Sequence, residues 1–592
     1  MMCSNHGVCT TERGEFICKP YMTYSEVKNC CCVLNNIAWS VLPLQPRTEI
    51  SLSSTVMVCH QFDSNVEITC VDKNSFPKTL FCHDLKGGYL EDRFVNGSTV
   101  HDEYRFFHWA GIDTFVYFSH HFITVPPPVW ITAAHLHGVK ILGTVITEWK
   151  DGEAIWKEVL GSDDCVRQFA DRLVDICLHF SFDGYLLNVE NAIVKDSVPR
   201  LVMFVELLCA KLKLKLPHAE VVWYDSVTVD GDLKWQDELN DLNRTFFDHC
   251  DGIFLNYCWT DEKLKNTAMS AGCRKHDVYV GVDVFGRGCF GGGGFNTCKA
   301  MEVVRAHGLS AALFAPGWVH EFLGKENFAT HEYVFWQKLW SFLHPHGPCK
   351  LPFSTSFCQG FGNKLYHRGA VVSDTPWYNL GRQQHQPSVA SCLSDECVAE
   401  VCQEREAVGE GSDQQAEVSD ARRTESHGGC LHHCQHDGFC GGGCLEITMP
   451  AGCGSSRHTI LVCNFVCDGS LLVTTASKTR EEGPNICLLL AVDLSEMESR
   501  KQLLILVNGS SEHSNYQEND SCVVRPLMEN EAQQLNPNVV LMTGSHGWIV
   551  SHYMLNINGV IRTVGAELRG SGGSALLGYI SLSPVELQHK EH

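Results

Sequence analysis

The amino-acid sequence predicts an α/β protein in which a (β/α)8 TIM barrel precedes an all-β sandwich domain. Two patterns carry this prediction. Short apolar runs alternate with helical segments in the middle of the chain, as in parallel βα units. Toward the end, short alternating runs follow one another without helical spacing, as in a β-sandwich. The length of 592 residues also exceeds what one hydrophobic core usually supports.

The predicted barrel has eight strands joined by helices. The segments 165–178 and 198–214 repeat apolar residues three and four apart, as helices that pack on a barrel do. A ninth apolar run, 353–358, could serve as the eighth strand if the first were lost, which leaves the register open by one. The eight predicted strands are 79–83, 113–119, 139–146, 184–190, 221–226, 252–257, 278–285 and 311–315.

Composition divides the chain into four parts. Residues 1–75 are rich in cysteine and turn residues, and no role can be assigned to them; the predicted barrel spans 76–375. Residues 380–429 contain no aromatic ring of Phe, Trp or Tyr and are predicted to be an acidic flexible linker or insertion. The predicted sandwich spans 430–592, with candidate strands at 445–448, 459–462, 471–475, 503–507 and 548–555.

The charge balance excludes several partners. With 46 basic and 69 acidic residues, the formal charge is −23, so we predict no nucleic-acid binding and no binding to anionic lipid. A neutral substrate such as a sugar is compatible with this charge. The first twenty residues show no basic patch followed by an apolar run, and no stretch is long enough to span a bilayer, so we expect a cytosolic protein.

The 31 cysteines allow two interpretations, a secreted disulfide framework or reduced thiols. The absence of a leader, the odd count and the adjacent Cys30, Cys31 and Cys32 favour buried thiols. The segment CLHHCQHDGFCGGGC at 430–444 is a possible zinc site, but its spacings are irregular for paired ligands. We therefore predict no metal and no cofactor.

The segment FDGYLLNVEN at 182–191 is the most informative for function. Side chains alternate along a strand, so Asn188 and Glu190 share one face at its carboxyl end, where barrel enzymes keep their active sites. A strand that simply ends in solvent would also finish in polar residues. Other predicted strands nevertheless end in a similar mixture of rings, amides and carboxylates, which is typical of carbohydrate sites. These residues are Trp223, Tyr224, Asp225, Asn256, Tyr257, Trp259, Asp283, Arg287 and Trp318.

Several motifs resemble the endo-β-N-acetylglucosaminidases of glycoside hydrolase family 85. They run in order across the predicted barrel and suggest that 79–83 is its first strand. The matching segments are FCHDLKGGYLEDR (81–93), HWAGIDTFVYFSHH (108–121), LGTVITEW (142–149), FDGYLLNVEN (182–191), WYDSV (223–227), LKWQDELN (233–240), VGVDVFGRG (280–288) and LFAPGW (313–318).

The resemblance implies hydrolysis of the β-1,4 bond between the two N-acetylglucosamines of the N-glycan core, with retention through an oxazoline. Its substrates would be oligosaccharides, glycopeptides and glycoproteins. Glu190 would be the general acid and base, Asn188 would orient the substrate's acetamide, and Tyr224 would assist the acid. The remaining candidates for substrate contact are Trp223, Asp225, Asn256, Tyr257, Trp259, Asp283 and Trp318. An inert, lectin-like barrel is the alternative, although the acid is retained.

Overall fold

The computed structural model describes residues 9–12, 15–18, 21–28, 40–51, 62, 69–71, 75–86, 88–388, 430–480, 483–494, 501–508, 521–528, 531 and 543–585. The predicted linker lies mostly outside these residues, as does much of the cysteine-rich segment 1–75. Predictions about those parts stay predictions.

Eight parallel strands close into a barrel, which confirms the predicted fold. Along the barrel wall each strand pairs with the next, and the last pairs back to the first. The first strand lies at 79–83, so the open question of register is settled in favour of eight strands that start there. The strands are β6 (Thr79–His83), β7 (Thr114–Tyr117), β9 (Lys140–Glu148), β10 (Gly184–Glu190), β11 (Glu220–Tyr224), β12 (Gly252–Leu255), β13 (Val278–Asp283) and β14 (Ser310–Phe314).

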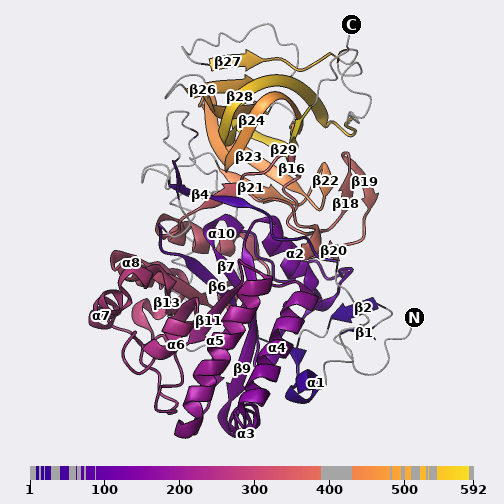
Figure 1. The fold of residues 1–592 in the computed structure, drawn as a ribbon. Coiled ribbons are helices and arrows are strands. Elements are labelled where there is room, and N and C mark those ends of the chain that lie inside the picture. The colour runs from indigo at the N-terminus through magenta and orange to yellow at the C-terminus, as the bar shows by residue number, and fades with distance from the viewer. Residues whose placement is uncertain are drawn as a thin grey trace, which may run out of the picture.

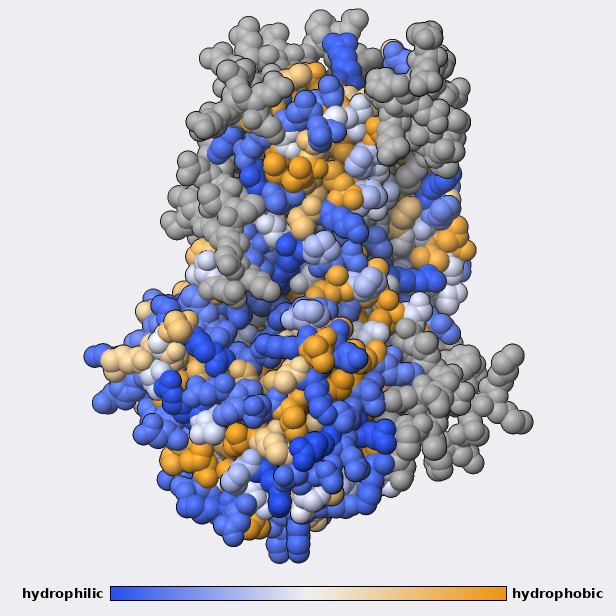
Figure 2. All heavy atoms as spheres, viewed as in Figure 1, coloured by the Kyte–Doolittle hydropathy of each residue, from blue (hydrophilic) through white to orange (hydrophobic). Residues whose placement is uncertain are grey.

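Helices cover the outside of the barrel (Figure 1). One of the two longest, α4, begins with favourable capping: the Ser162 hydroxyl accepts a hydrogen bond from the Cys165 amide, and two aspartates occupy its first turn. On the face shown in Figure 2, these helices present mostly hydrophilic residues, as the outer side of an amphipathic helix should. The helices are α2 (Pro128–Leu136), α3 (Trp149–Val159), α4 (Asp163–Phe180), α5 (Val198–Lys215), α6 (Arg244–His249), α7 (Asp261–Ala271), α8 (Thr297–Ala306), α9 (Trp318–Glu321) and α10 (Phe328–Leu339).

Short 3-10 turns complete this layer. They are η2 (Glu91–Arg93), η3 (Trp109–Gly111), η4 (Lys195–Ser197), η5 (Gly272–Asp277), η6 (Phe290–Gly292), η7 (Gly294–Asn296), η8 (Trp340–Phe342) and η9 (Leu380–Arg382). No helix in the described part of the chain combines the length and apolar character needed to cross a bilayer.

Alternate residues of the barrel strands face opposite sides. Leu186 and Tyr224 belong to the hydrophobic cluster inside the barrel. Their neighbours Leu187 and Trp223 belong to the larger cluster between strands and helices. This alternation decides which side chains can reach the mouth of the barrel.

Charged groups close the amino-terminal end of the barrel. Glu220 accepts hydrogen bonds from Lys140 Nζ (2.9 Å) and Tyr279 Oη (2.8 Å). Asp183, directly before β10, pairs with His135 Nε2 (2.8 Å) and His218 Nε2 (3.0 Å). Burial opposes the ionisation of both carboxyl groups, but these partners outweigh it and lower the pKa of Asp183 to about 2 and that of Glu220 to about 2.

Segments from the N-terminal part extend the barrel region. β3 (Tyr21–Met22) pairs with β8 (Ile123–Thr124), which pairs with β9. The other elements described before the barrel are the hairpin β1 (Cys9–Glu12) and β2 (Glu15–Cys18), the helix α1 (Tyr24–Lys28), and the strands β4 (Arg47–Ser51) and β5 (Thr69–Val71), which form a sheet with β15 (His346–Pro348).

The predicted β-rich C-terminal region is confirmed as a nine-stranded sheet. Its long strands β24 and β28 curve strongly (Figure 1), and one hydrophobic cluster contains both Leu445 of β23 and Leu504 of β26, which lie toward opposite ends of the strand order. The sheet therefore curls around a single core, as the two layers of a sandwich do. The strands are β16 (Phe353–Thr355), β21 (Leu431–Cys434), β23 (Cys444–Met449), β24 (Ser455–Thr479), β25 (Asn485–Leu494), β26 (Lys501–Leu506), β27 (Ser521–Val524), β28 (Ile549–Arg569) and β29 (Gly573–Pro584).

Two details differ from the strands expected here. The runs 459–462 and 471–475 belong to one strand, β24, because its pairing with β28 continues through Gly469. The ninth apolar run supplies β16, which pairs with β29 and not with the barrel. Small sheets of β17 (Phe361–Gly362) with β20 (Trp377–Tyr378), and of β19 (Ala370–Ser373), β18 (Leu365–His367) and β22 (Cys440–Gly441), connect the two regions.

Candidate active site

Strand β10 carries Asn188 and Glu190 to the carboxyl end of the barrel. Its start requires a glycine, because a Cβ on Gly184 would lie 1.9 Å from the carbonyl oxygen of Glu220. From there the alternation places Leu186, Asn188 and Glu190 on the inner face of the barrel. Asn188 is 5% exposed and Glu190 is half-buried, so the pair lies at the mouth and not in open solvent.

The Asn188 amide has one satisfied and one unsatisfied end. It hydrogen-bonds the Glu190 carboxyl group. Its Oδ1 is buried and has no hydrogen-bond partner among the described residues. An unpaired buried acceptor is costly, so such a group in a native site calls for a functional explanation. A ligand N–H that entered the mouth of the barrel would satisfy it.

A second carboxylate, Glu148, lies beside Glu190. The two residues are register partners on the neighbouring strands β9 and β10, and adjacent strands lie roughly 4.8 Å apart. Burial, and then the charge of Glu148, raise the pKa of Glu190 above its usual value. Glu148 is absent from the site residues expected from the sequence, although it lies in the motif segment 142–149, directly before Trp149.

His120 connects this pair to a cavity of about 480 Å³. Its Nδ1 lies 3.2 Å from the Glu148 carboxylate, and this hydrogen bond raises the pKa of the imidazole. The cavity lies against the loops that follow β6, β7, β13 and β14, and Asp84, Tyr89 and Arg287 line it together with His120. The mouth of the barrel thus combines two neighbouring carboxyl groups with a nearby cavity.

Tyr224 and Asn256 lie close together, as expected for the ends of neighbouring strands. They belong to a hydrogen-bond chain that continues to Asp237. The Tyr224 hydroxyl donates to Asn256 Oδ1 (2.9 Å), and Asn256 Nδ2 donates to Asp237 Oδ1 (2.6 Å). Burial, and then the neighbouring Glu190, raise the pKa of Tyr224 well above its usual value. Tyr257 packs against Tyr224, with ring centroids 6.4 Å apart.

Asp225 and Asp283 are tied to protein groups. Asp225 is 1% exposed and accepts hydrogen bonds from the amides of Gln236 and Asp237, so it anchors the loop after β11. Asp283 is held by Arg287 through two contacts of 2.7 and 3.0 Å. The side chain of Asp225 is enclosed by these contacts, and its expected role in substrate contact stays a prediction.

The three tryptophans expected at the rim point elsewhere. Trp223, Trp259 and Trp318 all belong to the buried cluster between the barrel and its helices. Trp223 stacks on Phe246 of α6 with ring centroids 4.2 Å apart. Strand alternation explains Trp223, because its neighbour Tyr224 takes the inward position.

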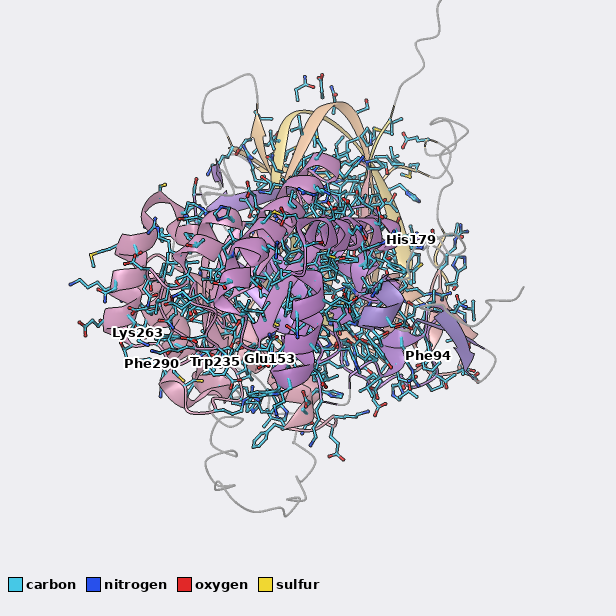
Figure 3. The ribbon with its side chains drawn as sticks, turned by 60° about the horizontal axis from the view of Figure 1, so that its bottom comes forward. Phe94, Glu153, His179, Trp235, Lys263 and Phe290 are labelled. Carbon is cyan, nitrogen blue, oxygen red and sulfur yellow. The ribbon has the colours of Figure 1, made fainter. Side chains whose placement is uncertain are left out.

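Other rings occupy exposed positions on the loops after the strands. Trp149 is 66% exposed, Trp235 38%, Phe290 44% and Phe322 61%. Figure 3 shows Trp235 and Phe290 on the same side of the barrel as Glu153 of α3. Trp149 and Trp235 lie within motif segments 142–149 and 233–240, so the signal was present in the sequence, but burial could not be read from it.

Backbone strain also gathers on these loops. Of the eight non-glycine residues with positive φ in the described part, four lie after the carboxyl ends of barrel strands: Tyr89, Asp237 and Ala315 on loops, and Trp149 as the first residue of α3. A bulky residue such as Trp149 at φ 50° is an outlier that the surrounding structure must enforce. Such positions cluster at functional sites, which supports the carboxyl end of the barrel as the active face.

The cysteine- and histidine-rich segment 430–444 shows no metal geometry. Among the described residues, no group of three or more His, Cys, Asp or Glu is arranged to hold a metal ion. The zinc alternative therefore finds no support there.

Comparison with known proteins agrees with this geometry. The model of glycosyl hydrolase family 85 matches residues 89–365. The chain is 48% identical over 329 residues to the cytosolic endo-beta-N-acetylglucosaminidase of Gallus gallus, which covers 54% of this chain and 45% of that protein. It is 50% identical over 312 residues to the protein of the same name from Homo sapiens, with 52% and 42% covered. The chain thus spans less than half the length of these relatives.

A solved structure supports the fold over a longer stretch. The glycoside hydrolase domain of Endo-D from Streptococcus pneumoniae R6 is similar with a TM-score of 0.67 and 17% identity, covering 95% of this chain and 82% of that one. At this identity the likeness concerns architecture alone. Through residues 89–365, slightly less than half of its length, this chain is similar to glycosyl hydrolase family 85, and its relatives at about half identity match a stretch of similar length.

Proposed function

We propose that this chain is an endo-β-N-acetylglucosaminidase that hydrolyses the β-1,4 bond between the two N-acetylglucosamines of the N-glycan core. It would act on free oligosaccharides, glycopeptides and glycoproteins and leave one N-acetylglucosamine on asparagine. The match to the family model over residues 89–365 and the names of the relatives support this proposal. The single observation that carries it is the pair of a buried, unsatisfied amide oxygen and a carboxyl group of raised pKa on one strand face.

The proposed reaction is retaining and assisted by the substrate. Glu190, whose pKa is raised by burial and by Glu148, donates its proton to the leaving oxygen. The 2-acetamido oxygen attacks C1 while Asn188 Oδ1 accepts the acetamide N–H, which orients the nucleophile and stabilises the oxazolinium charge. Glu190 then deprotonates the water that opens the oxazoline. Tyr224, close to Glu190, assists the acid and shapes the site.

Glu148 suggests a second mechanism for the same hydrolysis. Most retaining glycosidases use two carboxyl groups about 5 Å apart, one of them as nucleophile. The register of β9 and β10 puts Glu148 beside Glu190. We favour the substrate-assisted route because the Glu148 carboxylate is engaged by His120, whereas Asn188 Oδ1 has no partner among the described residues.

A two-substrate experiment separates these mechanisms. The wild-type protein should convert a high-mannose glycopeptide to a peptide that retains one N-acetylglucosamine, as detected by mass spectrometry. Asn188→Ala should lose glycopeptide cleavage by about 10²- to 10³-fold, the size of one lost oxyanion-type contact, but hydrolyse a supplied glycan oxazoline nearly as fast as the wild type. Accumulation of a covalent glycosyl-enzyme that Glu148→Gln abolishes would contradict the proposal.

The same experiment tests two related expectations. A wild-type preparation that binds the glycan and leaves it intact would favour a lectin-like barrel over an enzyme. We also propose a cytosolic location, on the strength of the relatives' names. Fractionation of cells that express the untagged chain tests this location, and recovery in the secreted fraction would contradict it.

A further inference from the structure

Strands β21 and β23 carry a row of reactive side chains far from the glycan site. His432 pairs with Glu446 and Cys434 with Cys444 across the two antiparallel strands. Cys430, directly before β21, is joined to Thr448 by the hydrogen bond from the Thr448 amide to its carbonyl. Because strand residues two apart share a face, Cys430, His432 and Cys434 line one side of β21.

Three of these residues form a relay with the geometry of an activated nucleophile. Cys430 Sγ lies 3.7 Å from His432 Nδ1, and His432 Nε2 lies 3.2 Å from the Glu446 carboxylate. Glu446 is itself fixed by Arg480 (2.9 Å) and by the Ser574 hydroxyl (2.7 Å). A nucleophile, a base beside it and a carboxylate that orients the base are the parts that activate a thiol in covalent chemistry.

We propose that Cys430 is a nucleophilic thiolate and a site of covalent modification by small disulfides and other soft electrophiles. Cys430 is half-buried and hence reachable, whereas Cys434 is 4% exposed and Cys444 is fully buried. The Thr448 hydroxyl, 2.9 Å from Cys430 Sγ, adds a further polar contact. Nothing in the proposed glycan chemistry uses this relay.

The surroundings favour the thiolate and imidazolium forms. Burial would raise the pKa of the Cys430 thiol, but the hydrogen bond and charge of His432 outweigh burial and lower it. In the same way, Cys430 and Glu446 overcome burial and raise the pKa of His432 to about 9. Both shifts favour the pair of thiolate and imidazolium, and only a thiolate attacks a disulfide at a useful rate.

The exchange with a small disulfide balances without any further reagent. The Cys430 thiolate attacks one sulfur of the disulfide, a new sulfur–sulfur bond forms to Cys430, and the original bond breaks. The departing sulfur takes the electron pair as a thiolate, which solvent protonates. Cys430 is oxidised and the departing thiol is reduced, so one mixed disulfide and one free thiol result.

Peptide mass spectrometry after brief exposure of the full chain to iodoacetamide or oxidised glutathione tests this proposal. At pH 6.5, Cys430 should react about tenfold or more faster than Cys453, an exposed cysteine of the same β domain. Between pH 6.5 and 8, the rate at Cys430 should rise less steeply than that of an ordinary thiol with a pKa of about 8.5, which gains about tenfold per pH unit while mostly protonated.

His432→Gln supplies the matched control. It should slow alkylation at Cys430 by about tenfold and leave Cys453 unaffected, with Glu446→Gln giving a smaller loss in the same direction. Unchanged circular dichroism and glycan cleavage would show that the variants fold. Should a variant not fold, the pH profile of the wild type still decides. Equal rates at Cys430 and Cys453 at pH 6.5, or a His432→Gln rate like that of the wild type, would overturn the proposal.

Discussion

Strand β10 has an acidic side chain at each end, and the pKa values of these two side chains are shifted in opposite directions. At the amino-terminal end, Asp183 is met by two imidazoles, and its pKa falls to about 2. At the carboxyl end, Glu190 is beside a like charge, and its pKa is raised. Both groups are at least partly buried, so burial alone does not distinguish them. The two groups are distinguished by the number of their partners and by the sign of the charge on those partners.

This difference separates charges that hold the fold from charges kept for chemistry. Asp183 and Glu220 have cationic or hydrogen-bonding partners that outweigh the cost of burying a carboxylate. At the other end, the pKa of Glu190 is raised, and Asn188 Oδ1 lacks a partner among the described residues. Sites that bind transition states are commonly less satisfied than the scaffold that carries them.

The largest effect is expected at the carboxyl end of β10. Glu190→Gln should lower kcat for glycopeptide cleavage by about 10²- to 10⁴-fold, because the general acid is lost. The melting temperature should stay unchanged or rise slightly, since an ion held against burial is removed. Kinetics on a high-mannose glycopeptide and a thermal melt check both outcomes. A large loss of stability with little loss of activity would show that Glu190 serves the fold and not the chemistry, contrary to the comparison between the two ends.

The counterpart at the amino-terminal end is Glu220→Gln. Lys140 would lose its buried carboxylate partner, and breaking such a pair costs about 3–5 kcal/mol of unfolding free energy. Activity at a temperature where the variant is folded should remain close to that of the wild type, because the mouth of the barrel is not touched. Chemical denaturation followed by fluorescence measures the loss. A variant that unfolds at the same denaturant concentration as the wild type would show that the charged groups at the amino-terminal end of the barrel do not stabilise the fold.

Because the pKa of Asp183 is lowered, acid should also destabilise the amino-terminal end of the barrel. Its stabilisation is fully present above the unfolded pKa of about 3.9 and is lost as pH falls through the folded value. A fall in pKa from 3.8 to about 2 corresponds to about 2.5 kcal/mol. The free energy of unfolding should therefore drop between about pH 5 and pH 2. In Asp183→Asn, that part of the pH dependence should be missing; an identical acid limb in both proteins would contradict the assignment.

Strand periodicity made most of the barrel predictable. The ranges 79–83 and 184–190 coincide with β6 and β10, since short apolar runs between helical segments have few alternative structures. The expectation that Trp223 lies at the rim of the barrel neglects the same alternation along β11. In the structure Trp223 packs behind the barrel wall, against Phe246. Glu148 could not be paired with Glu190 from sequence, because register between neighbouring strands depends on tertiary closure of the barrel.

The smallest effect is expected from removing the charge beside Glu190, and it tests directly whether neighbouring charges set the pKa of Glu190. Glu148→Gln removes the like charge beside Glu190, so the pKa of Glu190 should fall, although burial, the larger cause of its elevation, remains. The basic limb of the kcat/KM profile, which reports the protonated acid of the free enzyme, should move to lower pH. His120→Asn is the matched control: it removes a positive charge that lowers the pKa of Glu190, and the limb should move to higher pH. Parallel shifts in both variants would show that these charges do not set the proton affinity of Glu190.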